Sequence, residues 1–420
     1  MLKSILQVVD RPLGMRWKLV VILFLIGLCM HSVVFFRAHN EGDEIIYKTL
    51  VEQLDNGNGY TLQGSPLLEK GLIDRTQYDR PLFFHPPGGI VLHWLFHRTF
   101  GDFGFPLVQL FSYALFFWSM LFLARSMNLT SSNIALALVA SLSAFSPVMS
   151  HVTAKFWLDG PLLAFTTLAV AVYVWAVAQN KIRWVLLAGL ILGYASLIKI
   201  TAFLVVPGLI LMSWHFLKAP RTVTSLRFAL LLLATALIVQ IPWELWQWLK
   251  VGSPFPSWAG RPSESLVGSN KYVYYLTVIR SPWVYLKLTS VIIWTSMPTL
   301  FLFALLWCNK SLRWLRLSLM IWILTVLVFH MALGFMGYSK VFRYTILMTP
   351  AFILLFSSLL DEAVYRFKTE ENSPVAGVLS VVISISLLAY VLEILAGLQV
   401  SLFSHRDIIF PMIGGSWMMR

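Results

Sequence analysis

The chain has 420 residues, of which 58% are hydrophobic and 12% are charged, and its mean hydropathy is +0.76. This apolar content exceeds that of ordinary soluble domains and excludes a soluble globular protein. The formal net charge of +13 raises nucleic-acid binding as a function, but the basic residues are dispersed at the ends of apolar segments. The composition therefore predicts a polytopic membrane protein that contacts membrane lipids and binds no nucleic acid.

Apolar segments long enough to cross about 30 Å of hydrocarbon, roughly 20 residues each, recur along nearly the whole chain. The first covers Leu19 to Phe36, and the lack of a small-residue cleavage site after it favours an uncleaved span over a signal peptide. Further spans are predicted at residues 106–124, 132–148, 160–179, 184–198, 200–216, 227–249, 283–307, 317–335, 344–361 and 375–397. We expect an all-α fold with about 11 transmembrane helices.

The basic residues predict the topology, because they cluster in short connections separated by even numbers of spans. These clusters are Lys181/Arg183, Lys218/Arg221/Arg227, Lys310/Arg313/Arg316 and Arg366/Lys368. The amino terminus is then cytoplasmic, and the outer side receives the first loop, 37–104, with short amphipathic helices, and a second loop, 250–282. Residues 1–361 are expected to form one transmembrane module, and residues 362–420 a C-terminal span and an extracytoplasmic tail.

Charged residues gather on the outer side in a way that topology alone does not explain. The acidic pair Asp43–Glu44 follows the first span directly, whereas four cations occupy outer connections in which Lys and Arg are ordinarily scarce. These cations are Lys155, Lys199, Lys340 and Arg343. Snorkelling of a long side chain to the headgroups accounts for any one of them alone. Together, opposite an acidic loop, they predict a site for an anion.

Several motifs follow one another in an order that resembles a known family. The segment GDEIIY carries Asp43, Glu44 and Tyr47, and the segment FHPPGG carries Pro86 and Pro87. Later segments of the same kind are KFWLDGPLLAF with Asp159, GLILGYASLIKITAF with Lys199, PWELWQWLKVGSPF with Pro242 and Pro254, and VFRYTILMTP with Arg343 and Tyr344. The set resembles the C-superfamily integral-membrane glycosyltransferases, in particular the dolichyl-phosphate-mannose protein mannosyltransferase and aminoarabinose transferase family.

The resemblance implies an enzyme that transfers a hexose or pentose from a polyprenyl-phosphate carrier, with inversion at the anomeric carbon. The acceptor is a lipid, a glycan or a protein on the extracytoplasmic face. The resemblance does not distinguish between undecaprenyl phosphate and dolichyl phosphate as the carrier. The expected location is the plasma (inner) membrane, with the active site outside the cytoplasm.

The residues suit this chemistry. A sugar hydroxyl has a pKa far above 7, so its attack needs a carboxylate that accepts the proton, and Asp43 is the candidate base. The alternative is that Asp43 ligates a divalent cation with the support of Glu44, since hard oxygen ligands suit such ions. No cofactor is otherwise indicated.

The leaving group is a lipid phosphate whose growing charge protein cations must neutralise at headgroup depth. Lys199 fits this role because about fifteen residues of helix, about 22 Å, separate it from the cytoplasmic end of its span. Arg343 offers two parallel donors for phosphate oxygens. Lys155 and Lys340 are further candidates. Many relatives carry Lys before the Pro-Pro pair, where this chain has His85, which is only partly charged near neutral pH.

Several other polar and aromatic residues have both a structural and a functional interpretation. Asp159 either caps the helix that it begins or supports the acceptor or a metal. His93 and His97 could share a metal at i, i+4 spacing, although interfacial packing explains them without a third ligand. Most aromatic residues fit membrane-interface belts, whereas Tyr47, Tyr344 and Trp258 are candidates for substrate binding.

Two other classes of membrane protein compete with the enzyme. A transporter or lipid flippase would bind its substrate near the middle of the membrane, with ionisable residues buried there. Here the ionisable residues lie mainly at span ends, and no inverted repeat is evident. A scaffolding subunit would leave the one-sided polar cluster unexplained.

Overall fold

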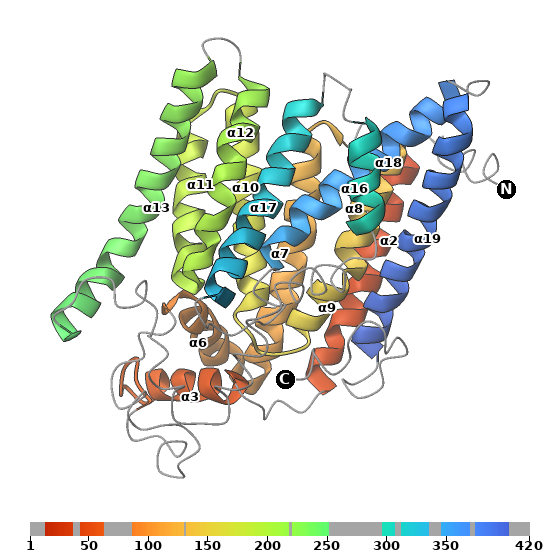
Figure 1. Cartoon of the computed structure of the whole chain (residues 1–420). Coiled ribbons are helices and arrows are strands. Elements are labelled where there is room, and N and C mark those ends of the chain that lie inside the picture. Colours follow the sequence, from red (N-terminus) through yellow and green to blue (C-terminus); the bar gives the residue numbers. More distant parts are fainter. Residues whose placement is uncertain are drawn as a thin grey trace.

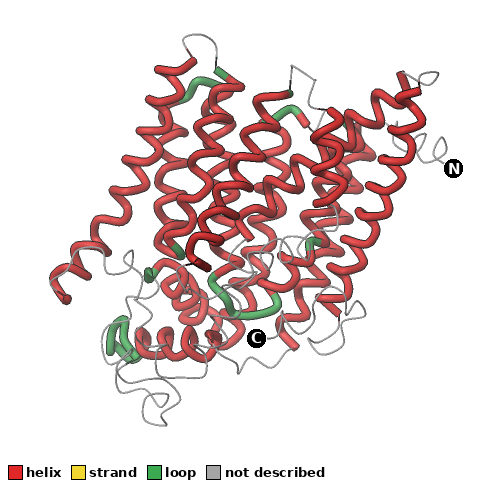
Figure 2. Tube along the Cα trace, in the orientation of Figure 1, coloured by secondary structure: helices red, strands yellow, loops and turns green. Residues whose placement is uncertain are grey.

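The computed structural model describes residues 13–36, 43–62, 86–129, 132–217, 221–251, 296–306, 312–335, 346–369 and 374–402. All regular secondary structure in these ranges is helical, and none of it is strand (Figure 2). The longer helices are α2 (Leu13–His31), α3 (Asp43–Asp55), α6 (Gly88–Phe100), α7 (Gly104–Ser126), α8 (Asn133–Phe145), α9 (Pro147–Thr153), α10 (Asp159–Ala178), α11 (Ile182–Ile198), α12 (Val206–Phe216), α13 (Arg221–Val251), α16 (Ser296–Leu306), α17 (Arg313–Phe335), α18 (Thr349–Thr369) and α19 (Pro374–Leu402). Short 3-10 helices join them, among them η1 (Ser32–Phe36), η2 (Gly101–Phe103) and η4 (Ile200–Val205). The expectation of an all-α fold is confirmed.

Eight helical segments within the described residues are long and apolar enough to cross a membrane. Two shorter apolar segments, Ile182–Ile198 and Ile200–Phe216, lie among them. The prediction of a polytopic membrane protein is therefore confirmed, whereas the count of about 11 spans stays a prediction. The segments lie side by side in one bundle, and α3 and α6 cover one end of it, here called the α3 end (Figure 1). The first predicted outer loop thus carries helices, as expected.

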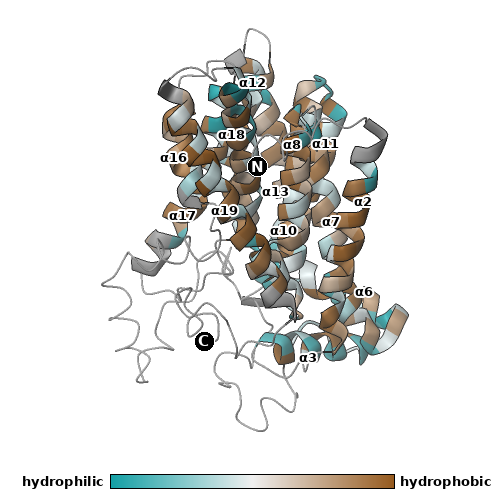
Figure 3. Ribbon diagram, turned by 90° about the vertical axis from the view of Figure 1, so that its right-hand side faces the viewer, coloured by the Kyte–Doolittle hydropathy of each residue, from teal (hydrophilic) through white to brown (hydrophobic). Residues whose placement is uncertain are grey.

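The helices of the bundle differ in how much of their surface the protein covers. The spans formed by α8 with α9, by α10 and by α18 are largely buried, whereas those formed by α2, α13 and α19 are largely exposed. The exposed side chains on these outer helices are mainly apolar, as the hydropathy colours show (Figure 3). Apolar side chains on spanning helices can face the membrane hydrocarbon without a desolvation cost. The central helices α7, α8, α10 and α18 therefore form the protein core.

The predicted span 132–148 corresponds to the candidate span Asn133–Thr153, which consists of two helices. Ser132 caps α8 by accepting hydrogen bonds from the backbone amides of Ile134 and Ala135. Helix α8 ends at Phe145, and Ser146 caps a new helix, α9, that begins at Pro147. A proline has no amide to donate and its ring clashes with the preceding turn, so the chain restarts as a new helix at this residue. Helix α9 consequently extends to Thr153, toward the α3 end.

The last helix belongs to the same bundle. The Tyr390 hydroxyl donates a hydrogen bond to Ser141 Oγ at 2.8 Å. A Cβ atom on Gly397 would lie 1.7 Å from the Phe145 carbonyl oxygen, so only glycine permits this approach of α19 to the end of α8. Helix α18 extends from Thr349 to Thr369, and the division of the chain at residue 361 stays a prediction.

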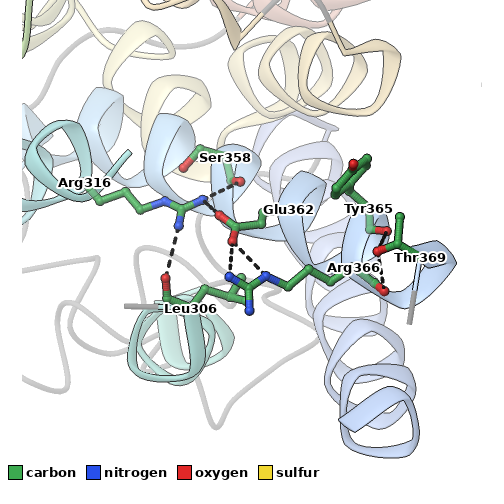
Figure 4. Close-up of polar contacts among 7 residues, drawn as sticks. All are labelled: Leu306, Arg316, Ser358, Glu362, Tyr365, Arg366 and Thr369. Atoms are coloured by element: carbon green, nitrogen blue, oxygen red, sulfur yellow. Dashed lines mark hydrogen bonds and ion pairs between the residues drawn. The ribbon is translucent and has the colours of Figure 1, made fainter. Parts of the chain in front are cut away.

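At the bundle end away from α3, buried charges join three helices (Figure 4). Glu362 of α18 lies 2.5 Å from Arg316 of α17 and 2.9 Å from Arg366. Arg316 also donates to the carbonyl oxygen of Leu306 of α16 at 3.4 Å and to that of Ser358 at 3.2 Å. The side chains of Arg316 and Glu362 are only 3% and 8% exposed. This cluster therefore holds α16, α17 and α18 together at this end.

Substitution Glu362→Gln should destabilise the protein, because it leaves the buried Arg316 without its compensating charge. Breaking a buried ion pair from one side costs about 3 to 5 kcal/mol. We expect a clearly lower melting temperature for the purified variant in detergent. The exposed Lys368→Gln in the same helix is the control and should melt like the wild type. Equal melting temperatures for the wild type and Glu362→Gln would contradict this role.

Candidate active site at the α3 end

The acidic pair Asp43–Glu44 lies in the first turn of α3. Carboxylates are favourable at this position because the helix dipole is positive there. Glu44 is buried, and its Oε1 atom accepts a hydrogen bond of 3.0 Å from the backbone amide of Phe156. Asp43 is only partly buried. The two carboxylates therefore differ, because Glu44 is tied to the protein interior through the connection that leads into α10.

The α9–α10 connection, residues 154–158, is fixed by side chains on several sides. Gln109 of α7 donates a hydrogen bond of 3.1 Å from Nε2 to the carbonyl oxygen of Trp157. The Phe156 ring stacks on Phe105 with 5.3 Å between centroids, and the Lys48 ammonium lies 5.1 Å from the Phe156 centroid. The connection is therefore held by hydrogen bonds to its backbone and by aromatic and cation–π contacts to its side chains.

Lys155 belongs to the same connection, and its ammonium lies 4.9 Å from the Trp157 ring centroid. The Lys155 residue is only partly buried. A cation–π contact leaves the ammonium positively charged. Lys155 thus stays a candidate for binding an anion.

Asp159 and Lys199 form a buried ion pair. Lys199 Nζ lies 2.7 Å from Asp159 Oδ1, and the two side chains are 11% and 1% exposed. Asp159 is the first residue of α10, and Lys199 is the extended residue between α11 and η4. The reading of Asp159 as a helix cap is not supported, because the N-cap residue is Leu158 and no side chain caps this helix. The second Asp159 oxygen, Oδ2, is buried and accepts no hydrogen bond within the described part of the chain.

The Pro-Pro-Gly-Gly segment brings the start of α6 against the end of α11. The Tyr194 hydroxyl donates a hydrogen bond of 3.0 Å to the Gly88 carbonyl oxygen. A Cβ atom on Gly88 would lie 2.9 Å from the backbone of Leu197, two residues before Lys199. Pro87 is the N-cap residue of α6. The motif thus packs α6 directly beside the helix break that carries Lys199.

These contacts connect residues that the sequence analysis had placed on one face of the membrane. Glu44 binds the amide of Phe156, and Phe156 lies three residues before Asp159, which pairs with Lys199. Asp43, Lys155 and Pro87 adjoin this chain of contacts in sequence. Four further candidates lie outside the described residues: His85, Trp258, Arg343 and Tyr344. The predicted cation Lys340 also lies outside them.

Tyr47, a candidate for substrate binding, is 1% exposed and belongs to the apolar core beneath α3. Its role in binding substrate stays a prediction. The histidine pair of α6 has separate surroundings. His97 Nε2 lies 3.3 Å from Asp55 Oδ2, and the Trp94 indole donates a hydrogen bond of 2.7 Å to Asp55 Oδ1, so both residues fasten α6 to α3. His93 is buried and stacks on Phe105.

A metal ion at Asp43 and Glu44 would have this carboxylate pair as its protein ligands in the described part of the chain. No group of three or more His, Cys, Asp or Glu side chains gathers there in a position to hold a metal. One Glu44 oxygen is already engaged by the Phe156 amide. Divalent cations such as Ca²⁺ need about six to eight oxygen ligands, and Mg²⁺ needs near-octahedral geometry. Mg²⁺ is commonly bound by one or two carboxylates together with waters and substrate phosphates, so a metal at Asp43 and Glu44 stays a prediction, and the reaction proposed below is written without it.

The sequence analysis missed two residues of this region. Gln109 lies in the middle of an apolar segment, and nothing local in the sequence shows that its amide meets a connection 48 residues away. Lys48 follows Glu44 by four residues on α3, a spacing that places both on one helix face. That spacing could have identified Lys48, whereas only the tertiary structure identifies Gln109.

Comparisons with known proteins agree with this arrangement. Residues 84–246 match the model of a family described as dolichyl-phosphate-mannose-protein mannosyltransferase. No curated protein sequence matches the chain at a significant level.

Solved structures resemble the whole bundle. The crystal structure of ArnT from Cupriavidus metallidurans in the apo state has a TM-score of 0.58 and 16% identity, over 91% of this chain and 77% of that one. The same protein bound to undecaprenyl phosphate gives a TM-score of 0.54 and 17% identity, over 92% and 77%. A third match is the archaeal oligosaccharyltransferase AglB from Archaeoglobus fulgidus, in complex with an inhibitory peptide and a dolichol-phosphate. It has a TM-score of 0.53 and 12% identity, over 91% of this chain and 56% of that one.

The resemblance expected from the motifs is thereby confirmed. The family match covers the α6 motif, Asp159 and Lys199, and the structural likeness extends over the spans on either side. The chain is an integral-membrane protein with the fold of the C-superfamily glycosyltransferases, and it resembles their dolichyl-phosphate-mannose protein mannosyltransferase and aminoarabinose transferase branch.

Proposed function

We propose that this chain transfers a sugar from a polyprenyl-phosphate carrier to an acceptor at the α3 end of the bundle, with inversion at the anomeric carbon. The observation that carries the proposal is the connected series of contacts from Glu44 through Phe156 to Asp159 and Lys199. It links an acidic helix start to a buried cation at the end of a membrane helix. The comparisons give no support to a transporter or flippase.

The proposed reaction needs one proton acceptor and one cation. The acceptor oxygen attacks the anomeric carbon and forms the new glycosidic bond, while its proton passes to Asp43. The bond between the anomeric carbon and the phosphate oxygen breaks, and its electron pair stays on the phosphate. Lys199 is the candidate that neutralises this charge. Arg343, Lys155 and His85 are candidates for further phosphate contacts.

Glu44 is better suited to positioning than to proton transfer, since its Oε1 atom holds the Phe156 amide. Tyr47, Tyr344 and Trp258 are proposed to contact the sugar or the acceptor. The donor is proposed to be a hexose or pentose on undecaprenyl or dolichyl phosphate, and the acceptor a lipid, a glycan or a protein.

The α3 end is proposed to face the outside of a prokaryotic plasma membrane. Exposed basic residues gather at the bundle end away from α3, where they follow α10 or lie near the ends of α7, α13, α17 and α18 (Figure 1). These residues are Arg125, Lys181, Arg183, Arg227, Arg313 and Lys368. The excess of Lys and Arg on cytoplasmic connections supports this orientation.

Asp43→Asn should slow transfer strongly, because an amide is a far weaker acceptor for the proton of the attacking hydroxyl than a carboxylate. Mass spectrometry of lipid-linked sugars and glycoconjugates, in cells with and without the gene, identifies the donor that accumulates and the product that is lost. With that donor, purified Asp43→Asn should be slower by about 10² to 10⁴-fold. Asp102→Asn, which removes a fully exposed carboxylate at the same bundle end, should keep the wild-type rate. Unchanged profiles in the deleted cells, or full activity of Asp43→Asn, would reject the assignment.

The orientation can be tested by labelling in intact cells. In a background with Cys29 and Cys308 changed to Ser, a membrane-impermeant maleimide should label Asp102→Cys without lysis. It should label Arg183→Cys only after the membrane is opened, because that exposed residue lies at the other end. The reverse pattern would place the α3 end in the cytoplasm.

A further inference from the structure

The ion pair between Asp159 and Lys199 poses a problem for phosphate binding. The Lys199 ammonium already has a carboxylate oxygen at 2.7 Å, and the pair is almost fully buried. A lipid phosphate that uses Lys199 therefore meets a cation that is already compensated. The phosphate must share Lys199 with Asp159, or it must displace the Asp159 carboxylate from Lys199.

Asp159 is held so that it stays beside Lys199. It begins α10, where the helix dipole favours a carboxylate. A Cβ atom on the next residue, Gly160, would lie 2.7 Å from Gln109 Oε1, so Gln109 packs directly against the first turn of α10. Gln109 and Glu44 also fix the connection before Asp159 through the Trp157 carbonyl and the Phe156 amide. The carboxylate is therefore built into a rigid part of the fold.

The chemistry of the proposed reaction gives such a carboxylate a purpose. A sugar-phosphate-lipid donor is a phosphodiester with one negative charge. The product is a phosphate monoester, which carries a charge of about −1.5 to −2 near neutral pH. A lone lysine would therefore hold the product more tightly than the donor, and product release would be slow. A fixed carboxylate beside the lysine weakens phosphate binding, and it repels the more highly charged product more strongly than the donor.

We propose that Asp159 is a counter-ion that competes with the lipid phosphate for Lys199 and thereby limits how tightly the product polyprenyl phosphate is held. The inference rests on the proposed function, and it assigns Asp159 a role that needs no proton transfer. Asp159 Oδ1 is already engaged by a charged donor, which makes it a poor acceptor for the hydroxyl proton. Its Oδ2 atom, buried and without a hydrogen bond in the described part of the chain, is available to accept from Lys199 when the ammonium turns toward a phosphate.

The test is binding of undecaprenyl phosphate to the purified full-length protein in nanodiscs, with undecaprenol as the uncharged comparison. Asp159→Asn should bind undecaprenyl phosphate more tightly by about tenfold, the effect of about one charge-assisted hydrogen bond. Lys199→Met should bind it more weakly by a similar factor. Asp159→Asn combined with Lys199→Met should bind like Lys199→Met alone, because the gain requires the lysine. A parallel series with dolichyl phosphate shows whether the effect depends on the carrier.

Two controls keep the result interpretable. Asp102→Asn removes one exposed negative charge from the same bundle end and should leave the affinity unchanged. Asp159→Ser is a second neutral variant, and the melting temperature of each variant reports whether it is folded. Tighter binding by both neutral variants supports the proposal.

The outcomes separate this inference from the proposed function. If the wild type binds neither undecaprenyl phosphate nor dolichyl phosphate better than the uncharged alcohol, the proposed function fails and the counter-ion role fails with it. If the wild type prefers the phosphate but neither neutral variant binds it more tightly, only the counter-ion role is overturned. A gain that persists without Lys199 would also overturn it, since the competition would then not involve that lysine.

Discussion

The pairing of Asp159 with Lys199 is the interaction on which the α3 end of this protein depends. It joins the start of α10 to the break after α11, and the glycine pair at the start of α6 packs against the residues just before that break. Isolated charges at this depth would be costly, so each side chain makes the burial of the other tolerable. The helix break that carries Lys199 is thereby stabilised by the Asp159 carboxylate.

The two ends of the bundle use buried charge differently. At the end away from α3, Glu362 meets both Arg316 and Arg366, and Arg316 also reaches two backbone carbonyl oxygens (Figure 4). That cluster joins α16, α17 and α18. At the α3 end, the buried ion pair of Asp159 and Lys199 joins the start of α10 to the residue after α11. The Glu362 cluster therefore holds helices together at one end, whereas the Asp159–Lys199 pair lies among the residues proposed to bind the donor phosphate at the other.

Local sequence patterns predicted the part of the fold that depends on local physics. Apolar runs identify spans because backbone groups in lipid must be satisfied within the helix, and the basic connections indicate which span ends lie on one side. The division of residues 132–148 at Ser146–Pro147 was readable in principle, since serine before proline is a helix start. The candidates Asp43, Glu44, Asp159 and Lys199 came from motif order and from charges in unexpected connections.

Contacts between distant residues could not be predicted in the same way. The Asp159–Lys199 pair joins residues 40 positions apart, and the Glu44 hydrogen bond joins residues 112 positions apart. Neither spacing has a local signature, because helix packing sets which faces meet. Gln109 is the clearest example, since its importance comes only from the carbonyl oxygen and the glycine that it contacts.

The most direct test of the account is an experimental structure of the full-length protein in a lipid nanodisc with bound undecaprenyl phosphate. The account predicts the phosphate within about 3 Å of Lys199 Nζ, in a cavity that Asp43 also lines. A phosphate bound elsewhere, or packed side chains that separate Asp43 from Lys199, would contradict it.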